Sequence, residues 1–235
     1  MSCDSTDWLC PLCRTSEGRP FYQDKREYFQ CPVCTLVFVL PHQFLSQKEE
    51  KSVYDLHENS TDDPGYRCFL ARLFDTLSRQ LAPNSCGLDF GSGPGPTLSV
   101  MFEEAGHSME IYDPFFAPEI KVFQQQYDFI VASEVVEHLH YPRQELDRLW
   151  SCLKPKGSLG IMTKRVIDRE AFSRWHYKND PTHVCFFSTE TFRWLADHWS
   201  SILTVPEKDV VLFTKKSDLT AADKKICNKL EGYLP

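Results

Sequence analysis

The chain has 235 residues, enough for one catalytic domain of common size and a small additional module. Hydrophobic residues make up 42% and charged residues 25%, a balance typical of chains that fold around a buried core, which excludes extended disorder. The formal net charge of −7 disfavours a surface that mainly binds nucleic acid, because phosphate contacts rely on clustered lysine and arginine, although a local basic strip is compatible with it.

The first residues, MSCDSTDWLCPLC, include acids and lack an apolar run of signal-peptide length. No later segment approaches the roughly 20 apolar residues that a membrane span requires. We therefore expect a cytoplasmic protein that does not enter a membrane. Because that compartment is reducing, the ten cysteines indicate metal binding or catalysis in place of a disulfide framework.

Four of the cysteines form two CxxC pairs, Cys10 with Cys13 and Cys31 with Cys34, with 17 residues between the pairs. This spacing is typical of a zinc ribbon, in which two tight turns bring four thiolates to the corners of a tetrahedron. Four cysteine ligands leave no open position for water, so we predict a structural Zn²⁺ in a ribbon over residues 1–42. The alternative is a set of four unrelated thiols.

A polar stretch over residues 43–65 is predicted to link the ribbon to the main domain. Asp62 or Asp63 can cap the helix that follows. From Tyr66 onward, apolar residues recur at helical spacing, which predicts an amphipathic helix that ends before Pro83.

Beyond this helix, segments with strand and helix patterns alternate. The expected strands are CGLDF, SMEIYD, YDFIVASE, GSLGIMTK and DVVLF, and the expected helices are PTLSVMFEEAG, YPRQELDRLWSCL and Thr189 through Trp199 behind a Ser188 cap. Such alternation predicts parallel βαβ units and an α/β fold with a doubly wound, mostly parallel, Rossmann-like sheet. We expect this domain over residues 66–216 and a C-terminal tail over 217–235.

A glycine-rich loop, LDFGSGPGP, follows the first of these strands and contains Gly91, Gly93 and Gly95. Such a loop lets backbone approach a ligand at the carboxyl end of a parallel strand. The third glycine follows the second by two positions, whereas the dinucleotide fingerprint requires three. Asp89 would repel a pyrophosphate here but suits the ammonium and sulfonium groups of S-adenosylmethionine. Asp113, at the end of the next strand, is placed to accept hydrogen bonds from ribose hydroxyls. A helix cap and a turn aspartate are the alternatives for these two acids.

The ordered segments LDFGSGPG, EIYD and YDFIVASEVVEHL resemble the class I S-adenosylmethionine-dependent methyltransferases, over roughly residues 83–215. The resemblance implies three groups of cofactor contacts. The methionine end would be lined by Asp89, Gly91, Gly93 and Gly95, the ribose would be held by Asp113, and the other edge of the cofactor would face Ser133 and Glu134. A ribbon ending in YFQCPVCTLVFVLP ahead of such a domain also resembles bacterial methyltransferases whose substrates are largely unassigned.

The sequence departs from that family between Asp113 and Asp128. Only 14 residues lie between these two aspartates, too few for the usual helix, edge strand and second helix. We therefore expect the third family strand to be reduced or missing, together with the acid that often contacts adenine. Phe115 and Phe116 are candidates to cover the base, and they are equally compatible with the core.

Two histidines are candidates for the acceptor side of the site. His138, in EVVEHLH, follows the strand expected beside the cofactor, and His183, in NDPTHVCFFS, precedes the last helix. Either can act as a general base or bind the acceptor, since methyl transfer requires the acceptor to be held in line and to lose or share a proton. The alternative for His138 is a surface or helix-capping histidine. The aromatic segment RWHYKND over residues 174–180 is compatible with a lid or with a loop docked over the sheet.

These observations predict an S-adenosylmethionine-dependent methyltransferase that acts on a small or carrier-bound molecule. Two alternatives remain. One is an RNA-modifying methyltransferase whose ribbon binds the substrate, and the other is a non-catalytic scaffold that only binds the cofactor. The oligomeric state is left open by the sequence.

Overall fold

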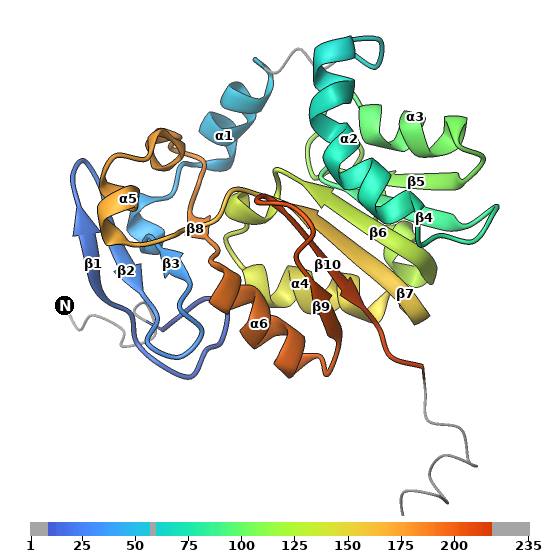
Figure 1. The fold of residues 1–235 in the computed structure, drawn as a ribbon. Helices are drawn as coiled ribbons and strands as arrows, with labels where there is room; N and C mark the ends of the chain where they lie inside the picture. Colours follow the sequence, from blue (N-terminus) through green and yellow to red (C-terminus); the bar gives the residue numbers. More distant parts are fainter. Residues whose placement is uncertain (1–8, 57–59, 218–235) are drawn as a thin grey trace, which may run out of the picture.

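The computed structural model describes residues 9–56 and 60–217. Figure 1 shows a small sheet on the N-terminal side and a large sheet covered by helices, joined by segments from both halves of the chain. Beyond residue 217, the predicted C-terminal tail lies outside the described residues. Within the described ranges, no helix combines the length and the apolar character that a bilayer span requires.

The large sheet has six strands in the order β5-β4-β6-β7-β10-β9. Their bounds are β4 Cys86–Phe90, β5 Ser108–Tyr112, β6 Tyr127–Ser133, β7 Leu153–Met162, β9 Ile202–Thr204 and β10 Val210–Thr214. The first four strands of this order run parallel, whereas β10 is antiparallel to both β7 and β9. This confirms the predicted mostly parallel sheet.

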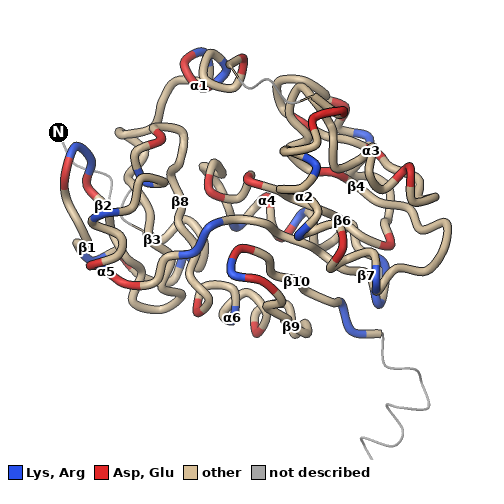
Figure 2. The backbone as a smooth tube through the Cα atoms, turned by 45° about the horizontal axis from the view of Figure 1, so that its top comes forward, with Lys and Arg blue, Asp and Glu red and all other residues tan. Residues whose placement is uncertain are grey.

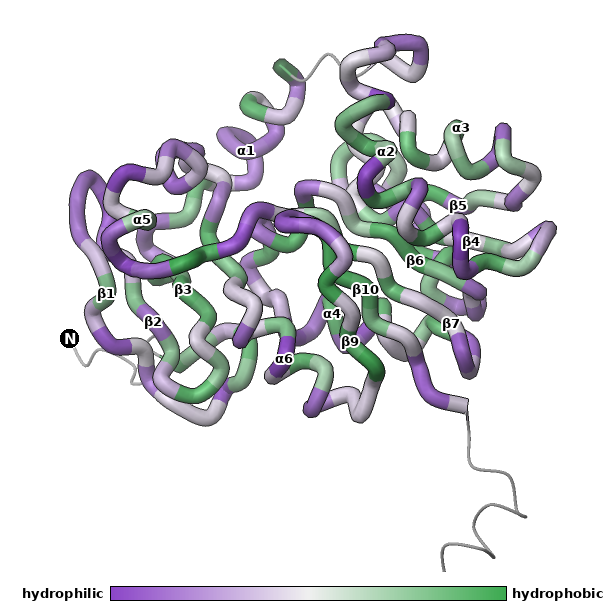
Figure 3. The backbone as a smooth tube through the Cα atoms, in the orientation of Figure 1, coloured by the Kyte–Doolittle hydropathy of each residue, from purple (hydrophilic) through white to green (hydrophobic). Residues whose placement is uncertain are grey.

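Helices cover both faces of the large sheet because successive strand residues point to opposite sides. On β6, Phe129 and Val131 pack with one apolar cluster, while Ile130 and Ala132 belong to the other. The first cluster includes residues of α2 Pro64–Ser78 and α3 Thr97–Glu104, and the second includes residues of α4 Pro142–Ser151 and α6 Thr189–His198. Figure 3 shows the central strands in hydrophobic green. The sheet is therefore doubly wound, as predicted.

The predicted loss of the third family strand agrees with the order of the sheet, in which β5 is the edge strand on its side. After β5 the chain makes a tight turn closed by Asp113 and Ala117, and a short 3-10 helix, η2 Ile120–Gln124, leads into β6. The connection is too short for a further strand and helix.

The small sheet takes strands from both ends of the sequence. It has the order β1-β2-β3-β8, with β1 Arg19–Gln23, β2 Glu27–Gln30, β3 Val37–Phe38 and β8 Cys185–Phe186. All three pairings are antiparallel, and the last joins Val37 to Phe186 and Phe38 to Cys185. A ribbon predicted over residues 1–42 alone thus lacked the fourth strand of its sheet.

The segment over residues 43–65, predicted as a linker, contains a helix, α1 Gln47–Tyr54, after a short 3-10 turn, η1 Pro41–Gln43. Ser46 and Glu49 form a capping box in which each side chain bonds the backbone of the other. Figure 3 shows α1 mainly in hydrophilic purple, which is why its sequence resembles a linker. Asp63 caps α2 by accepting hydrogen bonds from the next backbone amides, as predicted.

Candidate functional site

The glycine loop after β4 requires glycine at its first position. Gly91 and Gly93 have φ values of 76° and 63°, in the left-handed region that favours glycine. The Gly91 amide donates to the Tyr112 carbonyl oxygen at 2.7 Å, which ties the loop to β5. A Cβ atom on Gly91 would lie 2.4 Å from Cγ2 of Val135. The turn and the packing together exclude side chains at this place.

We expect Gly91→Ala to reduce the affinity for S-adenosylhomocysteine at least tenfold, because the loop must shift away from Val135. The strained backbone should also cost about 1–3 kcal/mol of folding free energy. Gly106→Ala is a matched control, since Gly106 also has a positive φ of 88° but a Cβ there meets no atom within 4 Å. Calorimetry of both variants measures the affinity for S-adenosylhomocysteine, and thermal unfolding measures the cost of backbone strain to stability. Equal affinities in the two variants would contradict the expectation.

Asp89 lies beneath the glycine loop. Its side chain is 4% exposed and accepts a hydrogen bond from the Ser99 hydroxyl at 3.0 Å. Burial raises the pKa of Asp89 to about 6. The carbonyl of Gly95 accepts from the Thr97 amide at the start of α3. Asp89 and Gly95 thus each accept a hydrogen bond from a residue of α3, which anchors the glycine loop to that helix.

Asp113 joins the end of β5 to the glycine loop. One carboxylate oxygen accepts from the Gly93 amide at 3.0 Å, and the other accepts from the amides of Phe115 and Phe116 at 2.8 and 3.0 Å. The residue is 7% exposed and lines a cavity. The oxygen that bonds the Gly93 amide keeps a further lone pair, so it can still accept a hydrogen bond from a ligand hydroxyl.

A cavity of about 740 Å³ runs along the carboxyl ends of the parallel strands. Its walls include three connected segments and side chains from other parts of the chain. They are the glycine loop (Gly91, Ser92, Gly93, Pro94), the turn after β5 (Asp113, Pro114, Phe115, Phe116), the end of β6 (Ser133, Glu134, Val135, His138) and, from elsewhere, Glu50, Tyr54, Tyr177, Asp180 and His183. This position is where open α/β sheets bind their ligands.

Two hydroxyl groups in the cavity wall lack partners. The side-chain oxygens of Ser92 and Ser133 are buried and accept or donate no hydrogen bond within the described ranges. Buried hydroxyls normally have a hydrogen-bond partner, so both serines are candidates to bond a polar ligand or water. Glu134, next to Ser133, has a φ of 52°, an uncommon conformation for a non-glycine residue that often marks functional sites.

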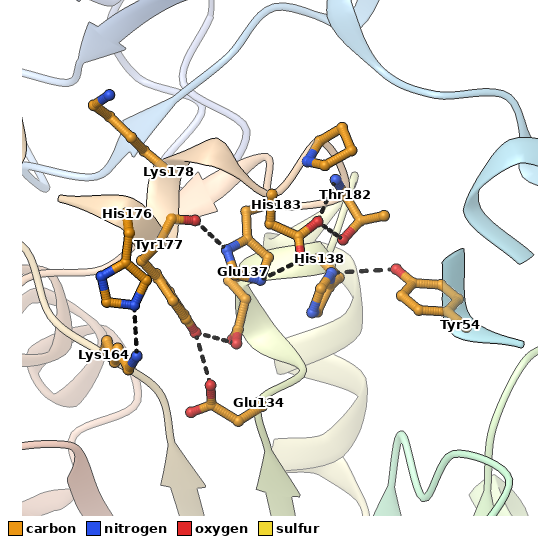
Figure 4. Close-up of polar contacts among 12 residues, drawn as sticks. Tyr54, Glu134, Glu137, His138, Lys164, His176, Tyr177, Lys178, Thr182 and His183 are labelled. Carbon is orange, nitrogen blue, oxygen red and sulfur yellow. Dashed lines mark hydrogen bonds and ion pairs between the residues drawn. The ribbon is translucent and has the colours of Figure 1, made fainter. Parts of the chain in front are cut away.

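A buried network of two carboxyl groups and a phenol lies between the cavity and the core (Figure 4). Glu137 is fully buried and accepts hydrogen bonds from the hydroxyls of Tyr177 and of Thr163, the latter at 2.9 Å. The Tyr177 hydroxyl also lies 3.3 Å from Glu134. Burial, followed by the charge of Glu134, raises the pKa of Glu137 to about 8.

The raised pKa predicts a pH-dependent stability. The folded protein binds the Glu137 proton more tightly than the unfolded chain, so the associated stability is complete below about pH 4.5 and declines as the pH rises through about 8. The slope for one group is at most about 1.4 kcal/mol per pH unit. Glu137→Gln should flatten this decline in urea unfolding at several pH values. An identical slope in the variant would contradict this expectation.

The two predicted histidines lie together in the cavity wall, with ring centroids 4.6 Å apart. Nδ1 of His183 donates to the Tyr177 carbonyl oxygen at 2.7 Å, which leaves Nε2 as the acceptor in the neutral ring, 3.8 Å from Asp180. Burial lowers the pKa of His183 below its usual range. Nδ1 of His138 lies 3.2 Å from the hydroxyl of Tyr54 on α1 (Figure 4).

Sequence reasoning missed Tyr54 and Glu50 because α1 was taken for a linker. Tyr54 contacts His138 and the ring of Phe115, and Glu50 accepts from His140 at 2.8 Å. The capping box of α1 was the available signal. Helix α1 thus joins the acceptor end of the cavity to the aromatic residues after β5.

The aromatic segment after α5 Arg169–Ser173 contacts the ribbon and also lines the cavity with Tyr177 and Asp180. Trp175 stacks on Tyr177 with centroids 4.9 Å apart, and a 3-10 helix, η4 His176–Asn179, holds the segment. Tyr177 and Lys178 are buried, and Lys178 forms an ion pair with Asp24 of the ribbon.

The four cysteines of the two CxxC pairs meet at one point. Sulfur atoms lie 3.4 Å apart between Cys10 and Cys34 and between Cys13 and Cys31, and all four side chains are buried. Four thiolates this close together would repel one another strongly, so a bound cation would stabilise the charged form of the cluster. The donor set fits Zn²⁺.

A second group, Glu137, His138 and His183, also offers ligand atoms within 4.8 Å of one another. The Glu137 carboxyl, however, already accepts from the hydroxyls of Thr163 and Tyr177. We interpret this group as part of the hydrogen-bonded wall of the cavity.

Solved structures similar to this chain include methyltransferases. One is a Burkholderia thailandensis 1,6-didemethyltoxoflavin-N1-methyltransferase with bound 1,6-didemethyltoxoflavin and S-adenosylhomocysteine, 16% identical, where the match covers 85% of this chain and 99% of that chain with a TM-score of 0.47. Another is an O-methyltransferase family protein from Burkholderia thailandensis, 10% identical, covering 72% of this chain and 63% of that chain with a TM-score of 0.47. No curated protein sequence matches the chain.

The family comparison covers the four parallel strands of the large sheet and most of the cavity wall. Residues 64–198, more than half of the chain, match the family described as methyltransferase domain. This range begins with α2, includes the glycine loop and both cavity histidines, and ends with α6. The chain therefore belongs to the methyltransferase domain family.

Proposed function

We propose that this protein is an S-adenosylmethionine-dependent methyltransferase that acts on a small or carrier-bound acceptor, and that its ribbon holds a structural zinc ion. The observation that carries the proposal is that one continuous cavity joins the glycine loop to His138 and His183. Its volume of about 740 Å³ lies in the range of sites for small molecules, roughly 300–1,000 Å³.

The glycine-loop end fits the cofactor. The backbone of Gly91 and Gly93 would hold the methionine part, Asp113 the ribose, and the unpaired hydroxyls of Ser92 and Ser133 add polar contacts. When bound, the cofactor supplies a methyl group on a positively charged sulfur. Asp113 and Glu134 line the cavity, and Asp89 lies beneath it, so the local charge favours a cation over a diphosphate.

The histidine end fits the acceptor. His183 is neutral near pH 7 because burial lowers its pKa, and its Nε2 lone pair can take the proton that the acceptor loses. His138, perpendicular to it and hydrogen-bonded to Tyr54, would bind or orient the same group. The acceptor is therefore expected to carry a nucleophile with a proton, such as a hydroxyl or amine.

The charge distribution favours a small acceptor over RNA. Figure 2 shows blue and red segments interspersed over both lobes, and the turn between β1 and β2 carries both signs. In that turn Lys25 and Arg26 stand between Asp24 and Glu27. Arg26 and Asp24 are also engaged with residues 178–183. Within residues 9–56 and 60–217, this mixing of signs differs from the clustered cations that phosphate binding requires.

Calorimetry of the purified protein with S-adenosylhomocysteine tests the cofactor, with ATP and NADH as competitors for the same crevice. We expect binding of S-adenosylhomocysteine alone; preference for either nucleotide would overturn the assignment. Incubation with methyl-labelled S-adenosylmethionine then compares a metabolite fraction, acyl-carrier fractions and total RNA. Label confined to RNA would favour the RNA-modifying alternative, and cofactor binding without any transfer would favour a scaffold.

A further inference from the structure

Arg26, in the turn between β1 and β2 of the ribbon, forms hydrogen bonds with the backbone of the segment that carries His183. Its guanidinium donates hydrogen bonds to four carbonyl oxygens of residues 178–183. These belong to Lys178, to Asp180 at 3.0 Å, to Pro181 at 3.3 Å and to His183 at 2.9 Å. A planar guanidinium with five N–H donors can satisfy such a set, whereas a lysine ammonium cannot reach the same geometry.

Two neighbours of Arg26 reinforce this contact. The Tyr28 hydroxyl donates to the Lys178 carbonyl at 3.1 Å and accepts from Nε of Arg26 at 3.2 Å. Lys178, which is 5% exposed, forms its ion pair with Asp24, two residues before Arg26. The turn between β1 and β2 therefore contacts both the backbone and the side chain of Lys178, at the start of the segment 178–183.

The far end of the segment is also fixed by the ribbon. Strand β8 pairs with β3, and the Val39 amide donates to the Val184 carbonyl oxygen at 3.1 Å. On the other side, the Val184 amide donates to the Glu137 carbonyl oxygen at 2.8 Å. Figure 1 shows β8 next to β3, with the connection to α5 above it. The segment is thus clamped between the ribbon and the loop after β6.

The direction of the His183 ring depends on the shape of this segment. The Nδ1 proton of His183 is donated to the carbonyl of Tyr177, six residues earlier. The orientation of the ring therefore depends on the same turn whose carbonyl oxygens accept hydrogen bonds from Arg26. A change in the turn would move the ring and its accepting Nε2 together.

We propose that Arg26 is a positioning residue: the ribbon uses it to hold residues 178–183 in the shape that points His183 Nε2 into the cavity. The role of His183 in the reaction rests on the proposed function, but the positioning itself does not. The ribbon is then part of the acceptor site, although none of its cysteines lines the cavity.

The surroundings of His183 provide a readout. Burial is the main cause that lowers its pKa, the charges of Arg26 and Lys164 act in the same direction, and Asp180 and the bond to the Tyr177 carbonyl act in the opposite one. A variant that removes Arg26 lets solvent reach the ring and removes one positive charge. Both changes raise the pKa of His183.

The test uses the full-length protein with Arg26→Met, Arg26→Lys and, as a matched control, Arg19→Met on an exposed position of β1. Hydrogen exchange reports the amides of residues 176–187, and NMR titration reports the pKa of the His183 ring, assigned by its loss in His183→Gln. Calorimetry with S-adenosylhomocysteine reports the cofactor end.

For Arg26→Met we expect exchange at His183 and Val184 at least tenfold faster, a higher pKa of His183, and affinity for S-adenosylhomocysteine within twofold of the unchanged protein. Arg26→Lys should rescue part of both changes, and Arg19→Met should alter neither. Unchanged exchange and pKa in Arg26→Met would overturn the positioning role. If Arg26→Met does not fold, the same measurements on Arg26→Lys test the proposal, because lysine keeps the charge but loses the planar hydrogen-bonding group. Faster exchange at His183 and Val184 in Arg26→Lys would support the positioning role, and unchanged exchange would overturn it. Absence of S-adenosylhomocysteine binding in the unchanged protein would instead reject the proposed function.

Discussion

Replacement of Cys31 by serine is expected to abolish binding of the proposed zinc ion and unfold the ribbon. The four buried sulfurs lie close together, and a module as small as the ribbon buries too small a share of its surface to compensate for the loss of a metal. Structural zinc contributes roughly 10–16 kcal/mol in isolated zinc-finger peptides, so a loss of several kcal/mol is expected here. Metal analysis and thermal unfolding measure the two effects.

Cys68→Ser is the matched control, because Cys68 is exposed on α2 and far in sequence from the two pairs. It should keep the zinc content and the unfolding temperature. The Cys31→Ser change should further expose residues 176–187 to hydrogen exchange, since β8 pairs only with β3 in the described sheet. A stable, metal-free protein with unchanged exchange would contradict the predicted zinc site.

The large sheet could be predicted because its signals are local. On β6, residues on either face are apolar since both faces are covered by helices, which gives the continuous run FIVA. Caps at Asp63 and Ser188 mark helix starts through contacts within three residues. Alternation of such segments then leaves few possible topologies.

The small sheet could be predicted only in part because its fourth strand is not local. Strand β8 has two residues, and its partner β3 lies near the other end of the chain. Nothing in the neighbourhood of Cys185 distinguishes it from a loop. The contacts of Arg26 with residues 178–183 are missed for the same reason, since they join positions more than 150 residues apart.

The part of the candidate site in which a sequence motif fixes the backbone conformation could be predicted. The part that depends on contacts between side chains distant in sequence was missed. Gly91 and Gly93 were found because positive φ values restrict the residue type. Glu137 belongs to no recognisable motif in the sequence, whereas the structure pairs it with Tyr177 and Thr163. That network joins η4 to the segments that follow β6 and β7, and no periodicity in the sequence records such a meeting.

Replacement of His183 by glutamine is expected to slow methyl transfer about 10²- to 10⁴-fold, the usual contribution of a general base. Glutamine can keep a hydrogen bond to the Tyr177 carbonyl but cannot take a proton at pH 7. Because the glycine loop is separate, the affinity for S-adenosylhomocysteine should stay within twofold. His42→Gln, on an exposed turn of η1, is the matched control and should change neither quantity.

The pH profile separates a base from a residue that only shapes the pocket. The active form of His183 is the neutral ring, and its lowered pKa means that transfer by the unchanged protein should be flat near pH 7 and decline only below the usual histidine range. In His183→Gln that acidic limb should disappear along with most of the rate, measured with labelled methyl groups on the acceptor fraction. A full rate in the variant, or an acidic limb that persists, would assign the proton transfer to another group, with His138 as the next residue to replace.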